Sequence, residues 1–166
     1  MNEHLLKIDV YTYICIMKIE DAIKQSKFRT MKEKALINVL FTANYFNLEQ
    51  NRLLKDFDIS VQQFNILVIL RGQHPKPASV KLLMERMLDK TSNASRLVEK
   101  LHNKGLVNRK PCDFDRRQVD VLITDKGLEL IEAASSSMDK MLSELCIEED
   151  QAAKLSELLD LSREKQ

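Results

Sequence analysis

One segment of the chain combines short hydrogen-bonding side chains with cations in a helical spacing. Apolar residues recur at intervals of three and four over residues 91–104, which predicts a helix with one buried face. An ordinary solvated surface is one interpretation of the opposite face. The other is that its side chains hydrogen bond to base edges or phosphates. The candidate binding residues on this face are Thr91, Ser92, Asn93, Ser95, Arg96 and Lys100.

A charged turn between two predicted strands is the second feature suited to binding anions. Residues 106–110 and 118–123 have the short alternating pattern of strands, and PCDFDRR lies between them. Arg117 is the first candidate for insertion into a narrow, negative groove, with Asp115 as the ion-pair partner that orients the turn. The alternative is an exposed turn with compensating charges. The candidates in this hairpin are Arg109, Lys110, Asp115, Arg116 and Arg117.

The charge of the chain is balanced in sum and uneven in place. The 166 residues have a formal net charge of +1, but residues 1–89 carry +3, residues 90–118 carry +5 and residues 119–166 carry −7. This asymmetry suggests a local anion-binding surface rather than a generally sticky protein. Both candidate features lie in the basic segment.

Composition and periodicity predict a mostly helical fold. The chain has only three Gly and three Pro, which leaves little turn chemistry for a β-sandwich or barrel. A long amphipathic helix is expected over residues 31–55, and another from Thr124, whose apolar residues continue in heptad-like steps to Leu145. The acids at residues 148–150 predict the start of a last helix.

Shorter elements are expected between these long helices. Ser60 and Gln63 form a capping box for a helix that Gly72 is expected to end, and Ser79 caps the next helix. Together with the 91–104 helix and the hairpin, this is the element order of a winged helix-turn-helix. In that arrangement the second helix enters the major groove and the hairpin reaches the minor groove.

Four motifs between residues 88 and 127 carry a family resemblance. They are LDKTSNASRLVEKLHNKGLV at residues 88–107, RK at residues 109–110, DFDRR at residues 113–117 and VLITDKG at residues 121–127. Together they closely resemble the multiple-antibiotic-resistance regulator (MarR) family of bacterial transcription factors. The resemblance runs from about Met17 to the C-terminus and is strongest from Ser79 to Leu130.

The resemblance implies how the chain is organised. It implies a single domain over residues 31–166 behind an N-terminal extension, residues 1–30. Residues 60–124 would form the winged helix-turn-helix DNA-binding lobe, and residues 31–55 and 124–163 the dimerisation helices. The expected fold class is therefore mostly α with a small β-hairpin wing. The first sixteen residues alternate as a strand does, with an extra helix or an arm as alternatives.

The resemblance also implies a function. A sequence-specific, DNA-binding transcriptional regulator is expected, acting as a homodimeric repressor on double-stranded DNA. A small lipophilic or phenolic effector would release it. One alternative is a redox-sensing regulator that uses Cys15 or Cys112, although the apolar neighbours of Cys15 favour an unreactive thiol. The other is a winged-helix module that binds an acidic protein partner.

Other classes of function lack a signal in the sequence. No nucleophile elbow, phosphate-cradling glycine loop or metalloprotease helix is present, so catalysis is not expected. The scattered histidines and cysteines match no metal-ligand spacing, and no cofactor is expected. No run of apolar residues is long enough to span a bilayer, and the N-terminus lacks a secretory pattern, so we expect no membrane association and a cytoplasmic location.

Overall fold

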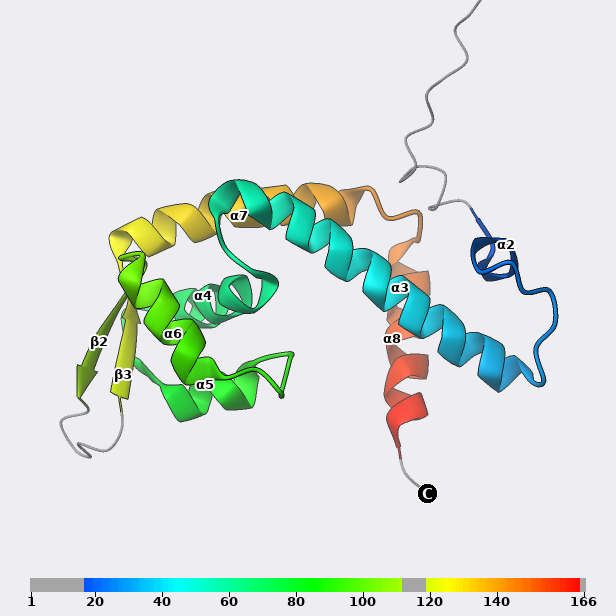
Figure 1. Cartoon of the computed structure of the whole chain (residues 1–166), viewed down its shortest axis with the longest axis horizontal. Coiled ribbons are helices and arrows are strands. Elements are labelled where there is room, and N and C mark those ends of the chain that lie inside the picture. The colour runs from blue at the N-terminus through cyan, green and yellow to red at the C-terminus, as the bar shows by residue number, and fades with distance from the viewer. Residues whose placement is uncertain (1–16, 112–118, 165–166) are drawn as a thin grey trace, which may run out of the picture. The chain divides into compact units, whose positions relative to one another are not determined.

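The computed structural model describes residues 17–111 and 119–164, in two compact units that divide after Glu49 (Figure 1). The first unit contains α2 (Ile19–Ala22) and most of α3 (Met31–Leu54). An ion pair between Glu20 and Lys34 joins these two helices, and the Lys34 hydrogen bond lowers the pKa of Glu20. The helix expected from residue 31 is thus confirmed, whereas the strand-like first sixteen residues lie outside the described part.

The second unit holds the remaining elements and confirms the mostly helical prediction. Its secondary structure comprises η1 (Lys55–Phe57), α4 (Val61–Gln73), β1 (Ala78–Ser79), α5 (Val80–Arg86), α6 (Ala94–Asn103), β2 (Val107–Pro111), β3 (Val119–Ile123), α7 (Asp125–Ser143) and α8 (Glu149–Arg163).

The helices of this unit begin where their capping residues place them. The Ser60 hydroxyl accepts a hydrogen bond from the Gln63 amide at 3.2 Å while the Gln63 side chain accepts one from the Ser60 amide, which completes the expected capping box. The Ser79 hydroxyl caps α5 through the Leu82 amide, and the Thr124 hydroxyl caps α7 through the Gly127 amide. The structure confirms the three caps that the sequence predicts.

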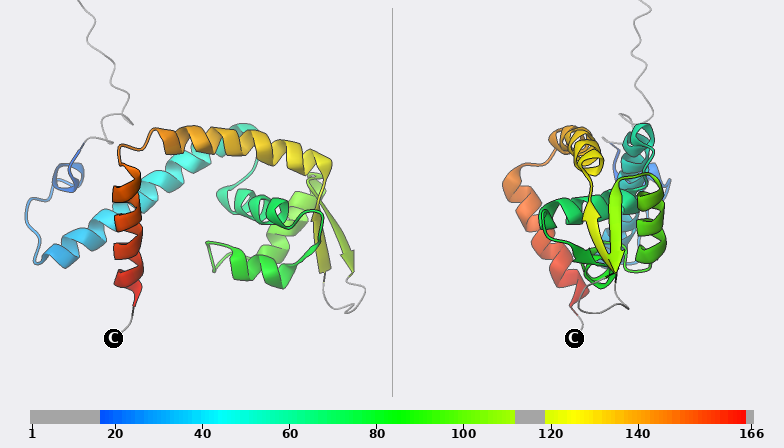
Figure 2. Two further views of the ribbon diagram at one scale, coloured as in Figure 1. Left: turned by 180° about the vertical axis from the view of Figure 1, so that it is seen from behind. Right: turned by 90° about the vertical axis from the view of Figure 1, so that its left-hand side faces the viewer.

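The sheet has three antiparallel strands in the order β1-β3-β2, of which β2 and β3 lie side by side in Figure 2. Val107 of β2 pairs with Ile123 of β3, and Ala78 of β1 pairs with Val121. The hairpin was expected, but the two-residue strand β1 was not, because two residues are too few to show an alternating pattern. β1 joins the start of α5 to the hairpin.

A hydrophobic core lies between α4, α5, α6, the sheet and the first half of α7. Its largest fully buried side chains come from every one of these elements. They include Ile66, Leu67 and Leu70 of α4, Leu83 of α5, Val98 and Leu101 of α6, Val107 and Val121 of the sheet, and Ile131 of α7. The packing of α6 within this core fixes which of its faces reaches solvent.

Two predicted helix ends are wrong. Helix α4 continues through Gly72 to Gln73, and among the described glycines only Gly105 has a positive φ. His74 instead takes an extended conformation, as a residue before proline prefers, and this ends the helix. Helix α7 ends at Ser143, so Leu145 lies beyond it rather than in its apolar stripe.

Gly127 sits where α7 passes the backbone of Leu106, and we expect Gly127→Ala to destabilise the fold. A Cβ there would lie 2.2 Å from the Leu106 carbonyl oxygen and 2.8 Å from Cγ1 of Ile123. Relieving such overlap costs about 1–3 kcal/mol. Urea denaturation should show the lower midpoint. Gly72→Ala is the matched control, because nothing lies within 4 Å of its Cβ. Equal midpoints for both variants would contradict this account of Gly127.

Candidate nucleic-acid interface

A loop organised by one carboxylate leads into α6. Oδ1 of Asp89 accepts hydrogen bonds from the Thr91 amide at 2.9 Å and the Thr91 hydroxyl at 2.7 Å, and Oδ2 accepts one from the Ser92 hydroxyl at 2.6 Å. These bonds from Ser92 and Thr91 lower the pKa of Asp89 to about 2. Asn65 of α4 holds the start of the loop, since its Oδ1 accepts a hydrogen bond from the Leu88 amide.

The hydrogen bonds in this loop determine what its hydroxyls can offer to a ligand. A hydroxyl has one donor hydrogen and two acceptor lone pairs. Thr91 and Ser92 both donate their hydrogen to Asp89, so their oxygens remain as acceptors. Both residues were predicted on the face of a helix, but they lie in the loop before it.

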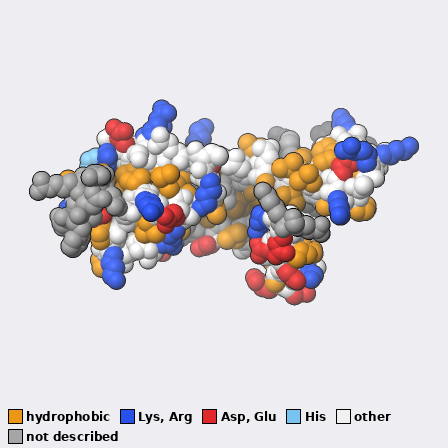
Figure 3. Space-filling model, turned by 90° about the horizontal axis from the view of Figure 1, so that it is seen from below, with side chains coloured by type: hydrophobic (Ala, Val, Ile, Leu, Met, Phe, Trp, Pro, Cys, Tyr) orange, Lys and Arg blue, Asp and Glu red, His pale blue; other side chains and the backbone are white. Residues whose placement is uncertain are grey.

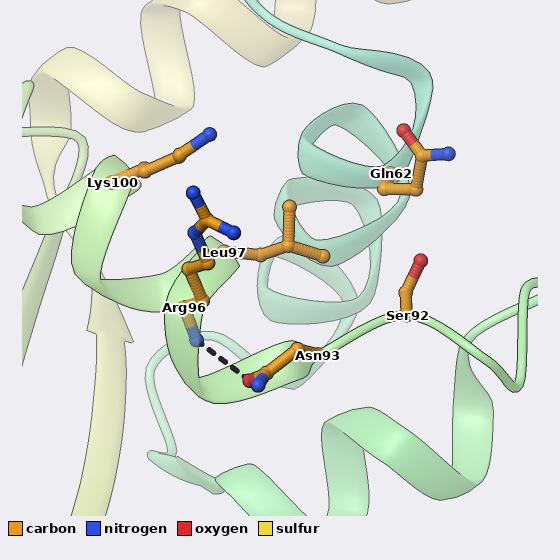
Figure 4. Close-up of a pocket in the computed structure, with 6 residues that line it drawn as sticks. All are labelled: Gln62, Ser92, Asn93, Arg96, Leu97 and Lys100. Atoms are coloured by element: carbon orange, nitrogen blue, oxygen red, sulfur yellow. Dashed lines mark hydrogen bonds between the residues drawn. The ribbon is translucent and has the colours of Figure 1, made fainter.

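Helix α6 begins three residues later than predicted because Asn93 caps it. Oδ1 of Asn93 accepts a hydrogen bond from the Arg96 amide at 3.0 Å, shown as a dashed line in Figure 4. The carboxamide oxygen of this candidate residue therefore accepts a hydrogen bond inside the protein, and its amino group keeps both donor hydrogens for a ligand.

The exposed face of α6 carries the other candidates from the sequence. Ala94, Val98 and Leu101 are buried on the inner face. The outer face presents Ser95, Arg96, Glu99 and Lys100, all of them exposed. Within the described part of the chain, neither Arg96 nor Lys100 has a carboxylate partner within 4.0 Å.

The hairpin follows α6 directly and is anchored to its end. Nδ1 of His102 lies 3.0 Å from the Val107 carbonyl oxygen, and the Thr124 hydroxyl donates to the Gly105 carbonyl at 2.8 Å. Arg109 and Lys110 of β2 are exposed. The remaining candidates of the hairpin, Asp115, Arg116 and Arg117, lie outside the described residues, as do the candidate redox residues Cys15 and Cys112.

A surface hollow of about 250 Å³ lies between α6 and the first turn of α4. Figure 4 shows its lining: Gln62 from α4, and Ser92, Asn93, Arg96, Leu97 and Lys100 from α6 and the loop before it. Gln62 is not among the binding residues that the sequence predicts. Its place beside α6 depends on how two helices pack, and nothing in the residue pattern around Ser60 signals that contact.

Two other kinds of site find no support in the described part of the chain. His, Cys, Asp and Glu residues there form no group of three that could hold a metal ion. No helix among the described residues combines the length and apolar character that crossing a membrane requires.

The distribution of charge distinguishes α5 and α6 from the C-terminal helix. On the face drawn in Figure 3, Lys and Arg side chains lie around apolar side chains on the side that carries α5 and α6, whereas acidic side chains gather on α8. Arg96 and Lys100 of α6 and Arg109 and Lys110 of β2 have no carboxylate partner in the described part. Helices α5 and α6, the supporting α4 and the β2–β3 hairpin together define a winged helix-turn-helix protein.

Comparison with known proteins finds similarity to one family of regulators. The family model described as "MarR family" matches residues 57–118. The regulator MgrA of Staphylococcus aureus is 27% identical over 109 residues, which cover 66% of this chain and 73% of MgrA. The uncharacterized regulator YhbI of Bacillus subtilis is 35% identical over 89 residues, 54% of this chain and 56% of YhbI. Over these residues the chain is similar to transcriptional regulators of the MarR family.

Solved structures agree with this fold. A MarR transcription factor from Planctomyces limnophilus has a TM-score of 0.59 and 27% identity over 82% of this chain and 98% of its own. The MepR–DNA complex of S. aureus has a TM-score of 0.64 at 21% identity, covering 75% and 91%. BpsR of Bordetella bronchiseptica, whose DNA binding is regulated by 6-hydroxynicotinic acid, has a TM-score of 0.66 at 19% identity, covering 77% and 93%.

We expect Asp89→Asn to lower thermal stability in a pH-dependent way. The pKa of Asp89 in the folded protein, about 2, lies below its ordinary value of 3.8. The ionised carboxylate therefore stabilises the fold above pH 4, and this contribution is lost as the pH falls towards 2. The difference in Tm between wild type and variant should be largest near neutral pH and shrink below pH 4. Asp139→Asn, an exposed substitution on α7, is the control. A difference independent of pH would rule out this role of the carboxylate.

Proposed function

We propose that this protein is a homodimeric, sequence-specific regulator that binds double-stranded DNA through α6 and the β2–β3 hairpin. The observation that carries the proposal is the outer face of α6, where Arg96 and Lys100 have no carboxylate partner among the described residues and Ser95 is exposed beside them. Two cations on one helix face that no described carboxylate neutralises give a local positive potential that suits a polyanion.

The two parts of the interface would act on different features of DNA. Helix α6 and the loop before it would lie in the major groove, where the hydroxyl oxygens of Thr91 and Ser92 and the side chain of Ser95 can meet base edges. The hairpin would reach the adjacent minor groove, with Arg109 and Lys110 on its strand and Asp115, Arg116 and Arg117 at its turn. The structure of MepR bound to DNA, with a similar fold, supports this arrangement.

Exposed apolar side chains support a dimer. Leu155, Leu158 and Leu161 of α8 are 48%, 52% and 61% exposed, and α3 also exposes large apolar residues, including Leu36 and Leu40. A single chain leaves these surfaces in contact with water, and a second copy would cover them. Two copies would place two α6 helices in successive major grooves of a pseudo-palindromic site.

The proposals about an effector and about repression are supported by similar proteins rather than by the geometry of this chain. The regulation of BpsR by 6-hydroxynicotinic acid supports release from DNA by a small aromatic effector, and the outcome we propose is repression. As a regulator without enzymatic activity that binds duplex DNA, the protein would act in the cytoplasm.

The first test is binding to the intergenic DNA upstream of its own gene. Fluorescence anisotropy should show affinity that falls steeply with salt, because bound phosphates release counterions. Arg117→Ala should weaken binding by about 1–3 kcal/mol. No binding at low salt, together with no retention of random duplex DNA, would instead favour a module that binds an acidic protein. An unchanged affinity of the variant would remove Arg117 from the wing.

The dimer is tested on α8. Leu158→Glu places a charge on a side chain that is already half exposed in the single chain, so the monomer should fold while the dimer dissociates. Light scattering after gel filtration should show a monomer for this variant and a dimer for wild type. Ser156→Glu adds the same charge at a polar position of the same helix. Dissociation by both variants, or by neither, would argue against an interface at Leu158.

A further inference from the structure

We propose that the hollow between α4 and α6 is a binding site for a phosphate group of the DNA backbone, held by Arg96, Lys100 and Gln62. This inference rests on the proposed function and divides its interface into groups that bind phosphate and groups that face bases. The hollow measures about 250 Å³ and opens at the surface beside the start of α6 (Figure 4).

The charges around the hollow favour an anion. Arg96 and Lys100 stand one helical turn apart, and like charges at this spacing disfavour a helix unless something compensates them. Lys104, one further turn along, is compensated, because its Nζ lies 2.8 Å from Oδ2 of Asp58. Neither Arg96 nor Lys100 has such a partner in the described part of the chain, and both line the hollow.

The remaining walls of the hollow define which groups can donate hydrogen bonds. Gln62 supplies a carboxamide from α4, opposite the two cations, and its interaction with Asp89 contributes to the lowered pKa of that carboxyl. Leu97 supplies an apolar wall. Ser92 also lines the hollow, but its hydroxyl hydrogen is donated to Asp89 at 2.6 Å. The donors left for a ligand are the guanidinium, the ammonium and the second amide hydrogen of Gln62, since its other hydrogen is directed at Asp89, and these groups suit an oxyanion.

Asp89 and the exposed Glu99 of α6 are negative groups near these cations, and their charge limits which anion can bind. Both carboxylate oxygens of Asp89 accept hydrogen bonds within the loop, which stabilise its ionised form. The negative charge of Asp89 repels an incoming anion and so weakens the binding of a free one. A free anion in an open hollow is also screened by salt. A backbone phosphate arrives with the rest of the duplex, which α6 and the hairpin hold in place, and for this reason DNA is the source we propose.

The assignment changes the role given to two candidate residues. Arg96 and Lys100 would position the duplex without reading its sequence, since phosphates are the same at every base pair. Exposed groups further towards the start of α6, Thr91 and Ser95, would then face the bases. Gln62 joins the interface from a helix outside the helix-turn-helix pair.

The test compares salt dependence on two duplexes. Anisotropy titrations of the full chain use the upstream intergenic fragment and a random-sequence duplex of equal length, each over a series of salt concentrations. Arg96→Gln and Lys100→Gln should each reduce the slope of log K against log salt by about 0.9 and weaken both duplexes by the same factor. Gln62→Lys should do the opposite, giving a steeper slope and tighter binding to both.

Two control variants separate phosphate contact from general effects. Ser95→Ala removes a hydroxyl from the same helix without changing charge, so it should leave the slope unchanged and weaken only the upstream fragment. Lys140→Gln removes an exposed cation from α7 and should change neither quantity. Thermal melts monitored by circular dichroism confirm that each variant is folded.

Several outcomes would overturn the proposal. Loss of affinity for the upstream fragment alone in Arg96→Gln and Lys100→Gln would make these residues base readers, and an unchanged slope in Gln62→Lys would exclude the hollow. Inorganic phosphate that displaces DNA from wild type but not from Lys100→Gln, at constant ionic strength, would show that the hollow takes a free anion instead. If the wild type binds neither duplex, the proposed function is refuted as well. If the wild type binds but the variants keep its affinity and salt slope, only this site is refuted.

Discussion

Burial of one face of α6 is the constraint on which the interface depends. Val98 and Leu101 are fully buried against the core, and they fix the rotation of the helix about its axis. Because side chains four residues apart share a face, this rotation directs Arg96 and Lys100 outward together, with Ser95 and Glu99 exposed beside them. A helix whose inner face packed less firmly could turn about its axis, and its polar groups would then have no defined direction. The ten residues of α6 therefore contribute one face to the core and the opposite face to the proposed interface.

Much of the fold could be predicted because its signals are local. The caps at Ser60, Ser79 and Thr124 each depend on a side chain and an amide three residues away, so sequence spacing alone reveals them. The order of elements and the uneven charge then led to the winged helix-turn-helix.

Features that depend on contacts between distant segments could not be predicted in the same way. Strand β1 exists because Ala78 meets Val121, forty-three residues away along the chain. Gln62 joins the lining of the hollow only because α4 and α6 pack together. The start of α6 was placed too early because Thr91 and Ser92 are compatible with a helix, whereas their hydroxyls bond to Asp89 and hold the loop in another conformation.

Ser79 belongs to two elements at once, and this has a mechanical consequence. Its backbone pairs with Asp120 in the sheet, while its hydroxyl caps α5 through the Leu82 amide. The helix-turn-helix and the hairpin are therefore connected at two points. One is Ser79, and the other is the short covalent link between α6 and β2. A body held at two points cannot hinge freely at either one. The helix and the hairpin would therefore engage or leave a duplex as a single rigid body, and the distance between two such bodies is the variable that an effector could change.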